Sequence, residues 1–117
     1  MYVLVRKDLP PAQQVVQACH AVAEAARSFL PAGQEHPHLI VCEVGGERAL
    51  YQFLDRLNHH GIRFRTFLEP DRDNELTALA TEPVKGDTRR LFRRLALLCP
   101  RSHPAVTADP NQDFLHP

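Results

Sequence analysis

Short apolar segments alternate with longer amphipathic ones through most of this chain, and that alternation limits the folds it can adopt. Tyr2 to Arg6 forms a short apolar segment rich in β-formers. Two prolines follow at 10 and 11, and apolar residues then recur at three- and four-residue steps from Ala12 to about Leu30. Proline suits the first turn of a helix. The change of period predicts a buried strand that leads into a helix.

The same alternation continues along the chain. Residues 38–44 predict a second strand, closed by two glycines, and the next amphipathic segment predicts a helix that ends at Gly61. Strands are predicted at 63–68 and 76–81, and a last helix at 88–98. The order is β-α-β-α-β-β-α, with helices long enough to connect parallel strands, so we expect one α/β domain over 1–98. Residues 99–117 are proline-rich and are predicted to form a tail.

Composition excludes several classes of protein. The 117 residues carry zero formal net charge and 44% hydrophobic residues, which fits one globular domain and not a polycation that coats nucleic acid. The three cysteines are widely spaced within or beside apolar segments, so we expect buried, reduced thiols and a cytoplasmic protein. The first apolar run is too short for a signal sequence or a membrane span.

The first predicted helix carries a polar stripe beside its apolar face. Because their spacing follows the helical repeat, five side chains align along it: Gln13, Gln17, His20, Glu24 and Arg27. The start of a helix that follows a strand is where α/β folds usually bind ligands. The alternative is a solvated helix face with a histidine at its edge.

Two further clusters contain side chains suited to catalysis or ligand binding. Four carboxylates fall within seven residues: Glu69, Asp71, Asp73 and Glu75. Three interpretations fit this cluster, namely a general base or acid, a cation site, and a solvated acidic turn. Thr77 is a hydroxyl candidate beside them. The basic cluster consists of Lys85, Arg89, Arg90, Arg93 and Arg94, and either phosphate binding or a solvated helix face accounts for it. The histidine pairs at 36 and 38 and at 59 and 60 match no zinc spacing, so no metal is expected.

Three segments resemble type 2 peptidyl-tRNA hydrolases, above all their divergent branch of peptidyl-tRNA hydrolase domain-containing proteins. Residues 3–9 resemble the family's first strand and its Arg-x-Asp-Leu turn, and residues 16–21 its Gln-x-x-His-Ala helix. Residues 76–83 resemble its threonine-containing strand that ends at proline. The resemblance implies a mixed four-stranded sheet with helices on both faces. It also implies hydrolysis of the ester between a peptide and tRNA, with no metal or cofactor.

Position by position, the resemblance assigns family motif positions to Asp8, Gln17 and His20, and an active-centre threonine to Thr77. The family's turn before the helix contains a lysine, and Gln13 stands roughly in its place. The family's aspartate loop is replaced by residues 69–74, so its catalytic aspartate corresponds to Asp71 or Asp73 or is absent.

The sequence thus predicts a hydrolase of peptidyl-tRNA or N-blocked aminoacyl-tRNA. The expected catalytic residues are Gln13, Gln17, His20, Asp71, Asp73 and Thr77, with Gln13 and Thr77 on opposite walls of one cleft. The expected tRNA-binding residues are Arg6, Lys7, Lys85, Arg89, Arg90, Arg93 and Arg94. The alternatives are a module that binds tRNA or a protein without hydrolysis, and another hydrolase chemistry on the same scaffold. The oligomeric state stays open, a homodimer included.

Overall fold

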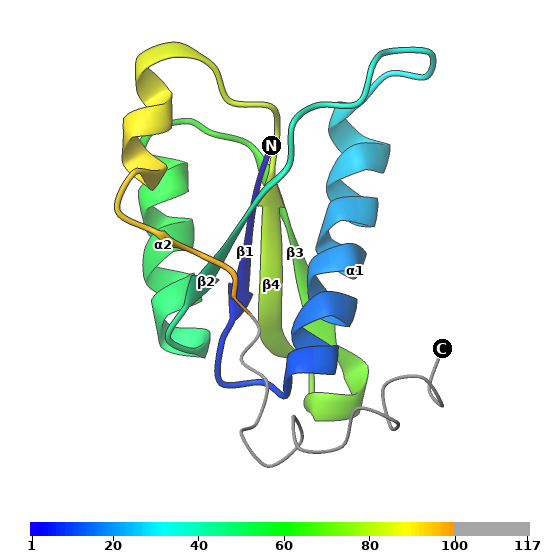
Figure 1. Cartoon of the computed structure of the whole chain (residues 1–117), viewed down its shortest axis with the longest axis vertical. Helices are drawn as coiled ribbons and strands as arrows, with labels where there is room; N and C mark the ends of the chain where they lie inside the picture. The colour runs from blue at the N-terminus through cyan, green and yellow to red at the C-terminus, as the bar shows by residue number, and fades with distance from the viewer. Residues whose placement is uncertain (100–117) are drawn as a thin grey trace, which may run out of the picture.

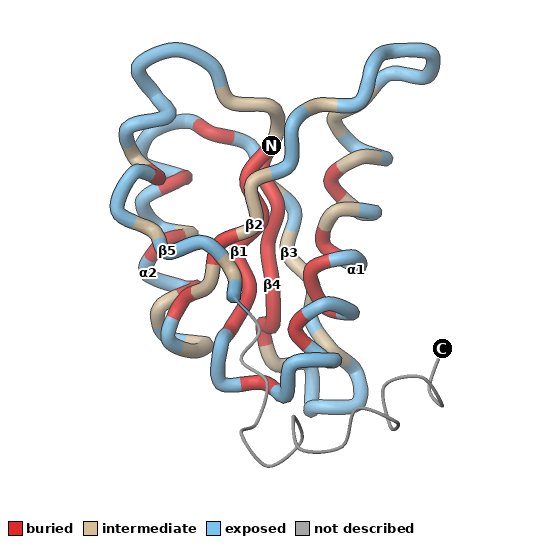
Figure 2. Tube along the Cα trace, viewed as in Figure 1, coloured by how far each residue is buried: buried red, intermediate tan, exposed pale blue. Residues whose placement is uncertain are grey.

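Strand β1 (Tyr2–Arg6) lies at the centre of the sheet, and all five of its residues are buried (Figures 1 and 2). The computed structural model describes residues 1–99. The other main elements are α1 (Pro11–Phe29), β2 (Ile40–Val44), α2 (Glu47–His59), β3 (Phe64–Glu69), β4 (Glu75–Thr81) and β5 (Ala96–Leu97). Two short 3-10 helices are η1 (Pro70–Arg72) and η2 (Gly86–Phe92). This is the α/β domain that the alternation predicts.

The sheet is mixed and has the strand order β3-β4-β1-β2-β5. Strands β1 and β2 are parallel, whereas β4 is antiparallel to both β1 and β3. Alternate residues of β1 face opposite helices: Val3 and Val5 pack with the alanines of α1, and Leu4 packs with Leu50 and Leu57 of α2. One helix therefore covers each face of the sheet (Figure 1).

The sheet has five strands where the sequence predicted four, and the predicted helix at 88–98 is wrong. Phe92 ends η2 and stacks on Tyr2, with ring centroids 3.9 Å apart. The chain then pairs with β2 as the two-residue strand β5, through Cys42 with Leu97 and Glu43 with Ala96. The helical pattern of this segment yields to contacts with distant strands that a sequence window does not contain.

A β-bulge at Thr77 shapes the face that α1 covers. Phe67 pairs with Ala78 and Leu68 pairs with Leu76, so Thr77 is the extra residue on β4. Leu76 belongs to the core beside α2, whereas Ala78 packs beside α1. The bulge turns Thr77 toward α1 instead of continuing the alternation, a known role of bulges near functional sites.

The structure also bears on the predictions about the cysteines, the tail and membrane spans. Cys42 is buried and burial raises its pKa, but Cys19 and Cys99 are exposed, so the expectation of three buried thiols is wrong. The predicted tail lies outside the described residues except for Cys99. Within residues 1–99, no helix has the length and apolar character needed to cross a membrane.

Candidate functional site

A chain of hydrogen bonds runs from the buried bulge to the surface of α1. The Thr77 hydroxyl donates to Gln17 Oε1 at 2.7 Å. Gln17 Nε2 donates in turn to Glu69 Oε2 at 3.2 Å and to Gln13 Oε1 at 3.3 Å. Thr77 is fully buried and Gln17 is 1% exposed, whereas Gln13 is exposed. The network therefore connects the interior of the sheet to solvent at the start of α1.

An exposed imidazole lies beside this network. His20 follows Gln17 by three residues on α1, so both lie on one side of the helix. Its ring stacks on Phe67 of β3 with centroids 4.4 Å apart and planes 11° apart. The stacking holds a titratable group at the surface close to the Gln17 amide.

Four of the six predicted catalytic residues thus come together: Gln13, Gln17, His20 and Thr77. The arrangement differs from the predicted cleft, because the Gln17 side chain bonds to both Gln13 and Thr77 and fills the space between them. Asp71 and Asp73 are exposed, and within residues 1–99 neither makes a side-chain hydrogen bond or ion pair.

The carboxylate that does reach the network is Glu69. Sequence reasoning grouped it with the acidic loop, whereas it is the last residue of β3. Successive strand side chains alternate between faces, so Glu69 shares a face with Phe67, which packs toward α1. Asp71 and Asp73 share this parity, but they follow Pro70, which ends the strand and begins η1. The proline is therefore the signal in the sequence that distinguishes Glu69 from Asp71 and Asp73.

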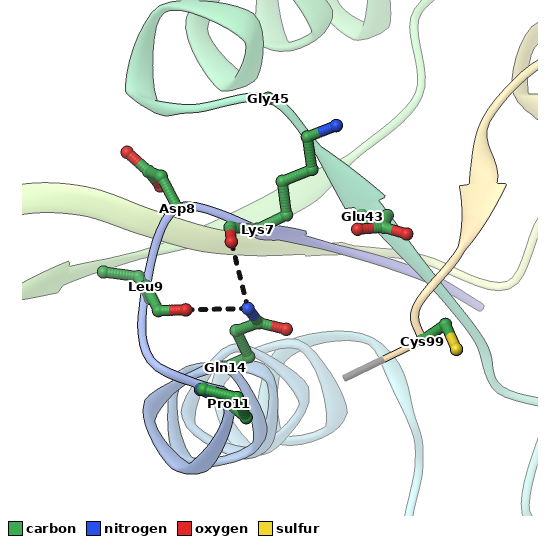
Figure 3. A pocket seen from close by; sticks show the side chains of 8 residues that line it. All are labelled: Lys7, Asp8, Leu9, Pro11, Gln14, Glu43, Gly45 and Cys99. Carbon is green, nitrogen blue, oxygen red and sulfur yellow. Dashed lines mark hydrogen bonds between the residues drawn. The ribbon is translucent and has the colours of Figure 1, made fainter. Parts of the chain in front are cut away.

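A cavity of about 400 Å³ lies on the other side of the α1 N-terminus, where the carboxyl ends of the parallel strands β1 and β2 meet (Figure 3). It is lined by Lys7, Asp8, Leu9, Pro11, Gln14, Glu43, Gly45 and Cys99. Gln14 Nε2 donates to the carbonyls of Lys7 and Leu9 at 3.1 and 2.7 Å and fixes the turn. This is the usual ligand position in α/β sheets. Neither Gln17 nor Thr77 lines it.

The assignment of Arg6 to tRNA binding needs correction. Its side chain is 7% exposed and forms two 2.9 Å hydrogen bonds with Asp8 and one of 2.7 Å with Glu75. The hydrogen bonds from Arg6 hold the pKa values of Asp8 and Glu75 below their usual range. A guanidinium already bound to two carboxylates inside the protein is not available to a phosphate. Asp8 is one of its two structural partners.

The basic cluster around η2 lies away from the hydrogen-bond network. Phe92 of η2 packs on Phe53 of α2, with centroids 5.4 Å apart, which places this segment on the α2 face of the sheet (Figure 1). The cluster's side chains are exposed; they are Lys85, Arg89, Arg90, Arg93 and Arg94. Gln17 and Thr77 lie on the α1 face. The sheet therefore separates these predicted tRNA-binding residues from the predicted catalytic ones.

The described part of the chain contains no set of side chains arranged to bind a metal ion. No three histidine, cysteine or carboxylate side chains within residues 1–99 converge so that they could hold an ion. The chemistry open to the network is that of amides, a hydroxyl, a carboxylate and an imidazole.

Comparison with known proteins found neither a family model nor a curated protein that matches this chain. The resemblance to type 2 peptidyl-tRNA hydrolases accordingly depends on the motifs quoted above.

Proposed function

We propose that this protein is a peptidyl-tRNA hydrolase-like enzyme that cleaves the ester between a peptidyl or N-blocked aminoacyl group and tRNA. One observation carries the proposal: the hydrogen-bond chain from Thr77 through Gln17 to Glu69, beside His20. Two residues of this hydrogen-bond chain, Gln17 and Thr77, and the neighbouring His20 stand at positions that resemble the family's motifs. Because such substrates arise in translation, we place the activity in the cytoplasm.

Ester hydrolysis needs a base that activates water and donors that stabilise the developing oxyanion. In our proposal Glu69 removes a proton from water, whose oxygen then attacks the ester carbonyl carbon. Gln13, at the exposed end of the network, donates an amide hydrogen to the carbonyl oxygen. Collapse of the intermediate breaks the bond to the ribose oxygen, which takes the proton back from Glu69. The products are the free acid and tRNA, and no co-reactant beyond water is needed.

Thr77 and Gln17 act in this scheme as positioning residues. The Gln17 oxygen accepts from Thr77, and its amide nitrogen donates to Glu69. A carboxylate bonded in this way is held in one orientation at the surface. Preorganised groups of this kind contribute more to catalysis than mobile ones, because they do not reorganise during the reaction.

A second function has an observation in its favour. Within the described residues no buried side-chain polar atom lacks a hydrogen-bond partner, so the network is satisfied without a ligand. This suits a module that keeps the fold, binds tRNA or a protein, and hydrolyses nothing. The two functions differ in their dependence on Glu69, which a binding module does not require.

The test is direct. The purified full chain is incubated with N-acetylated aminoacyl-tRNA, and release of the acyl group is followed against the spontaneous rate. We expect cleavage above background that falls when Glu69 is changed to Gln. Cleavage at the spontaneous rate, together with measurable tRNA binding, would establish the binding module instead.

A further inference from the structure

A pair of arginines lies on the α1 face, at the opposite end of β3 from Glu69. The guanidinium carbons of Arg63 and Arg65 lie 5.0 and 5.7 Å from the ring centroid of Phe29, at the end of α1. A cavity of about 420 Å³ opens beside them, lined by Phe29, Asn58, Gly61, Ile62, Arg63, Phe64 and Arg65. No carboxylate is among these lining residues.

The two arginines are held differently. Arg65 Nε donates to Ser28 Oγ at 2.8 Å, and within residues 1–99 its guanidinium makes no ion pair. Arg63 is bound to Glu82, with Nη2 3.1 Å from Oε1. Arg65 is therefore a cation that is already oriented by its helix neighbour and keeps its terminal nitrogens for a ligand. Such orientation reduces the entropy cost of binding.

Arg65 belongs to the same row of side chains as the proposed catalytic carboxylate. Arg65, Phe67 and Glu69 alternate along β3, and each contacts α1, through Ser28, His20 and Gln17 respectively. At about 3.3 Å per residue, Arg65 and Glu69 are roughly 13 Å apart along the strand. The seam between α1 and β3 thus has a guanidinium pair at one end and the carboxylate at the other.

We propose that Arg65, beside Phe29, binds a backbone phosphate of the single-stranded RNA end that carries the ester. This rests on the proposed function, because it places the ester at Glu69. A guanidinium fork matches phosphate geometry, and a basic surface with an aromatic ring is typical of single-strand binding. The η2 arginines lie on the α2 face of the sheet, so they do not contact an RNA end that is bound on the α1 face at Glu69.

The test is a binding measurement on the full chain with a short 5′-labelled single-stranded RNA, by fluorescence anisotropy at several salt concentrations. Arg65→Met keeps the apolar stem and removes the charge. Arg48→Met, at an exposed site on α2, makes the same charge change elsewhere. Loss of one phosphate contact should lower the slope of log affinity against log salt by ~0.7 for Arg65→Met and leave it unchanged for Arg48→Met.

Several outcomes would overturn the proposal. One is equal binding by wild type and Arg65→Met at every salt concentration. Another is weaker RNA binding by Arg93→Met together with unchanged RNA binding by Arg65→Met, which would assign RNA binding to the η2 surface. A third is displacement of the RNA by polyglutamate at equal charge concentration, which would indicate an acidic protein partner. Unchanged thermal melting of each variant verifies that folding is not the cause.

Ester cleavage separates this inference from the proposed function. If wild type cleaves the acyl-tRNA, Arg65→Met should raise KM several-fold with kcat nearly unchanged. Unaltered KM and RNA binding would refute the phosphate site while the hydrolase proposal stands. In a further outcome, wild type does not cleave the ester while Arg65→Met still lowers the slope of log RNA affinity against log salt. That result would uphold the phosphate site and refute the hydrolase proposal.

Discussion

The hydroxyl of Thr77 donates a 2.7 Å hydrogen bond to the amide oxygen of Gln17, and the two side chains are almost completely buried. The bond joins the bulge in β4 to α1. It also fixes the orientation of the amide, because the Glu69 carboxylate on its other side only accepts hydrogen bonds. The nitrogen of Gln17 must therefore face Glu69, and its oxygen must face Thr77.

Removal of this hydroxyl should destabilise the protein. Thr77→Val has nearly the same shape but leaves the Gln17 oxygen buried without a donor, which typically costs about 1–3 kcal/mol. Thr77→Ser keeps the donor and loses one methyl group, so it serves as the matched control. Urea unfolding should give a lower free energy of unfolding for the valine variant than for the serine variant. Equal values for wild type and Thr77→Val would show that the bond does not stabilise the fold.

The ion pairs of Arg6 should make stability depend on pH in the acid range. Arg6 lowers the pKa values of Asp8 and Glu75 in the folded state relative to the unfolded one. Their contribution is therefore complete above the unfolded carboxyl values of about 4, and it is lost as the pH falls through the lower folded values. We expect the free energy of unfolding to decrease below about pH 5.

Replacing Arg6 by Met should weaken that dependence. The variant loses the charged hydrogen bonds to Asp8 and Glu75 at neutral pH, where both carboxylates are ionised, so its free energy of unfolding should be lower than that of wild type. At low pH the same variant should differ less from wild type, because the carboxylates of both proteins are then protonated. Chemical denaturation at several pH values measures this convergence. Parallel curves for the two proteins would show that Arg6 does not control these carboxyl groups.

Periodicity in the sequence was sufficient for the elements with a strong local pattern. The stripe on α1 correctly placed Gln13, Gln17 and His20 on one side of the helix, since helical spacing alone determines this. The buried strand β1 was found because it is apolar throughout and followed by two prolines. The α/β class followed from the order of these elements.

Features that depend on distant contacts were not predictable. Strand β5 exists because residues 96 and 97 pair with β2, more than fifty positions earlier. The bulge at Thr77 is a property of the β3–β4 register, and without it strict alternation would turn Thr77 toward α2. Of the two carboxylates that bind Arg6, Glu75 lies 69 residues away, so the sequence did not show that this cation is enclosed between two partners.

By the resemblance to type 2 peptidyl-tRNA hydrolases, Gln13 stands roughly in place of the family's lysine, and we predict that a cation introduced there increases any hydrolysis. In Gln13→Lys an ammonium group would stand near Gln17 and Glu69 and donate a charged hydrogen bond to the developing oxyanion. One such donor is typically worth ~10²–10³-fold in turnover, which sets the upper limit of the gain. Gln13→Met, of similar length and without charge, is the control. A lysine variant no faster than the methionine variant would exclude this role for position 13.

The last prediction assigns the base among three carboxylates. Glu69 is the only one of Glu69, Asp71 and Asp73 that hydrogen-bonds to the Gln17 network within residues 1–99. A single general base typically contributes ~10²–10⁴-fold, so Glu69→Gln should reduce kcat by about that factor. Asp71→Asn and Asp73→Asn make the same change of charge two and four residues away and should leave kcat nearly unaltered.

Two measurements separate the loss of a base from a general loss of negative charge. Affinity for tRNA should be similar in all three variants, since none of these carboxylates is expected to bind phosphate. The acid limb of the pH–rate profile, which reports ionisation of the base, should disappear with Glu69→Gln and persist in both aspartate variants. If an aspartate variant loses activity and Glu69→Gln retains it, the base lies in the loop that the sequence first indicated, and the contact between Glu69 and Gln17 is structural.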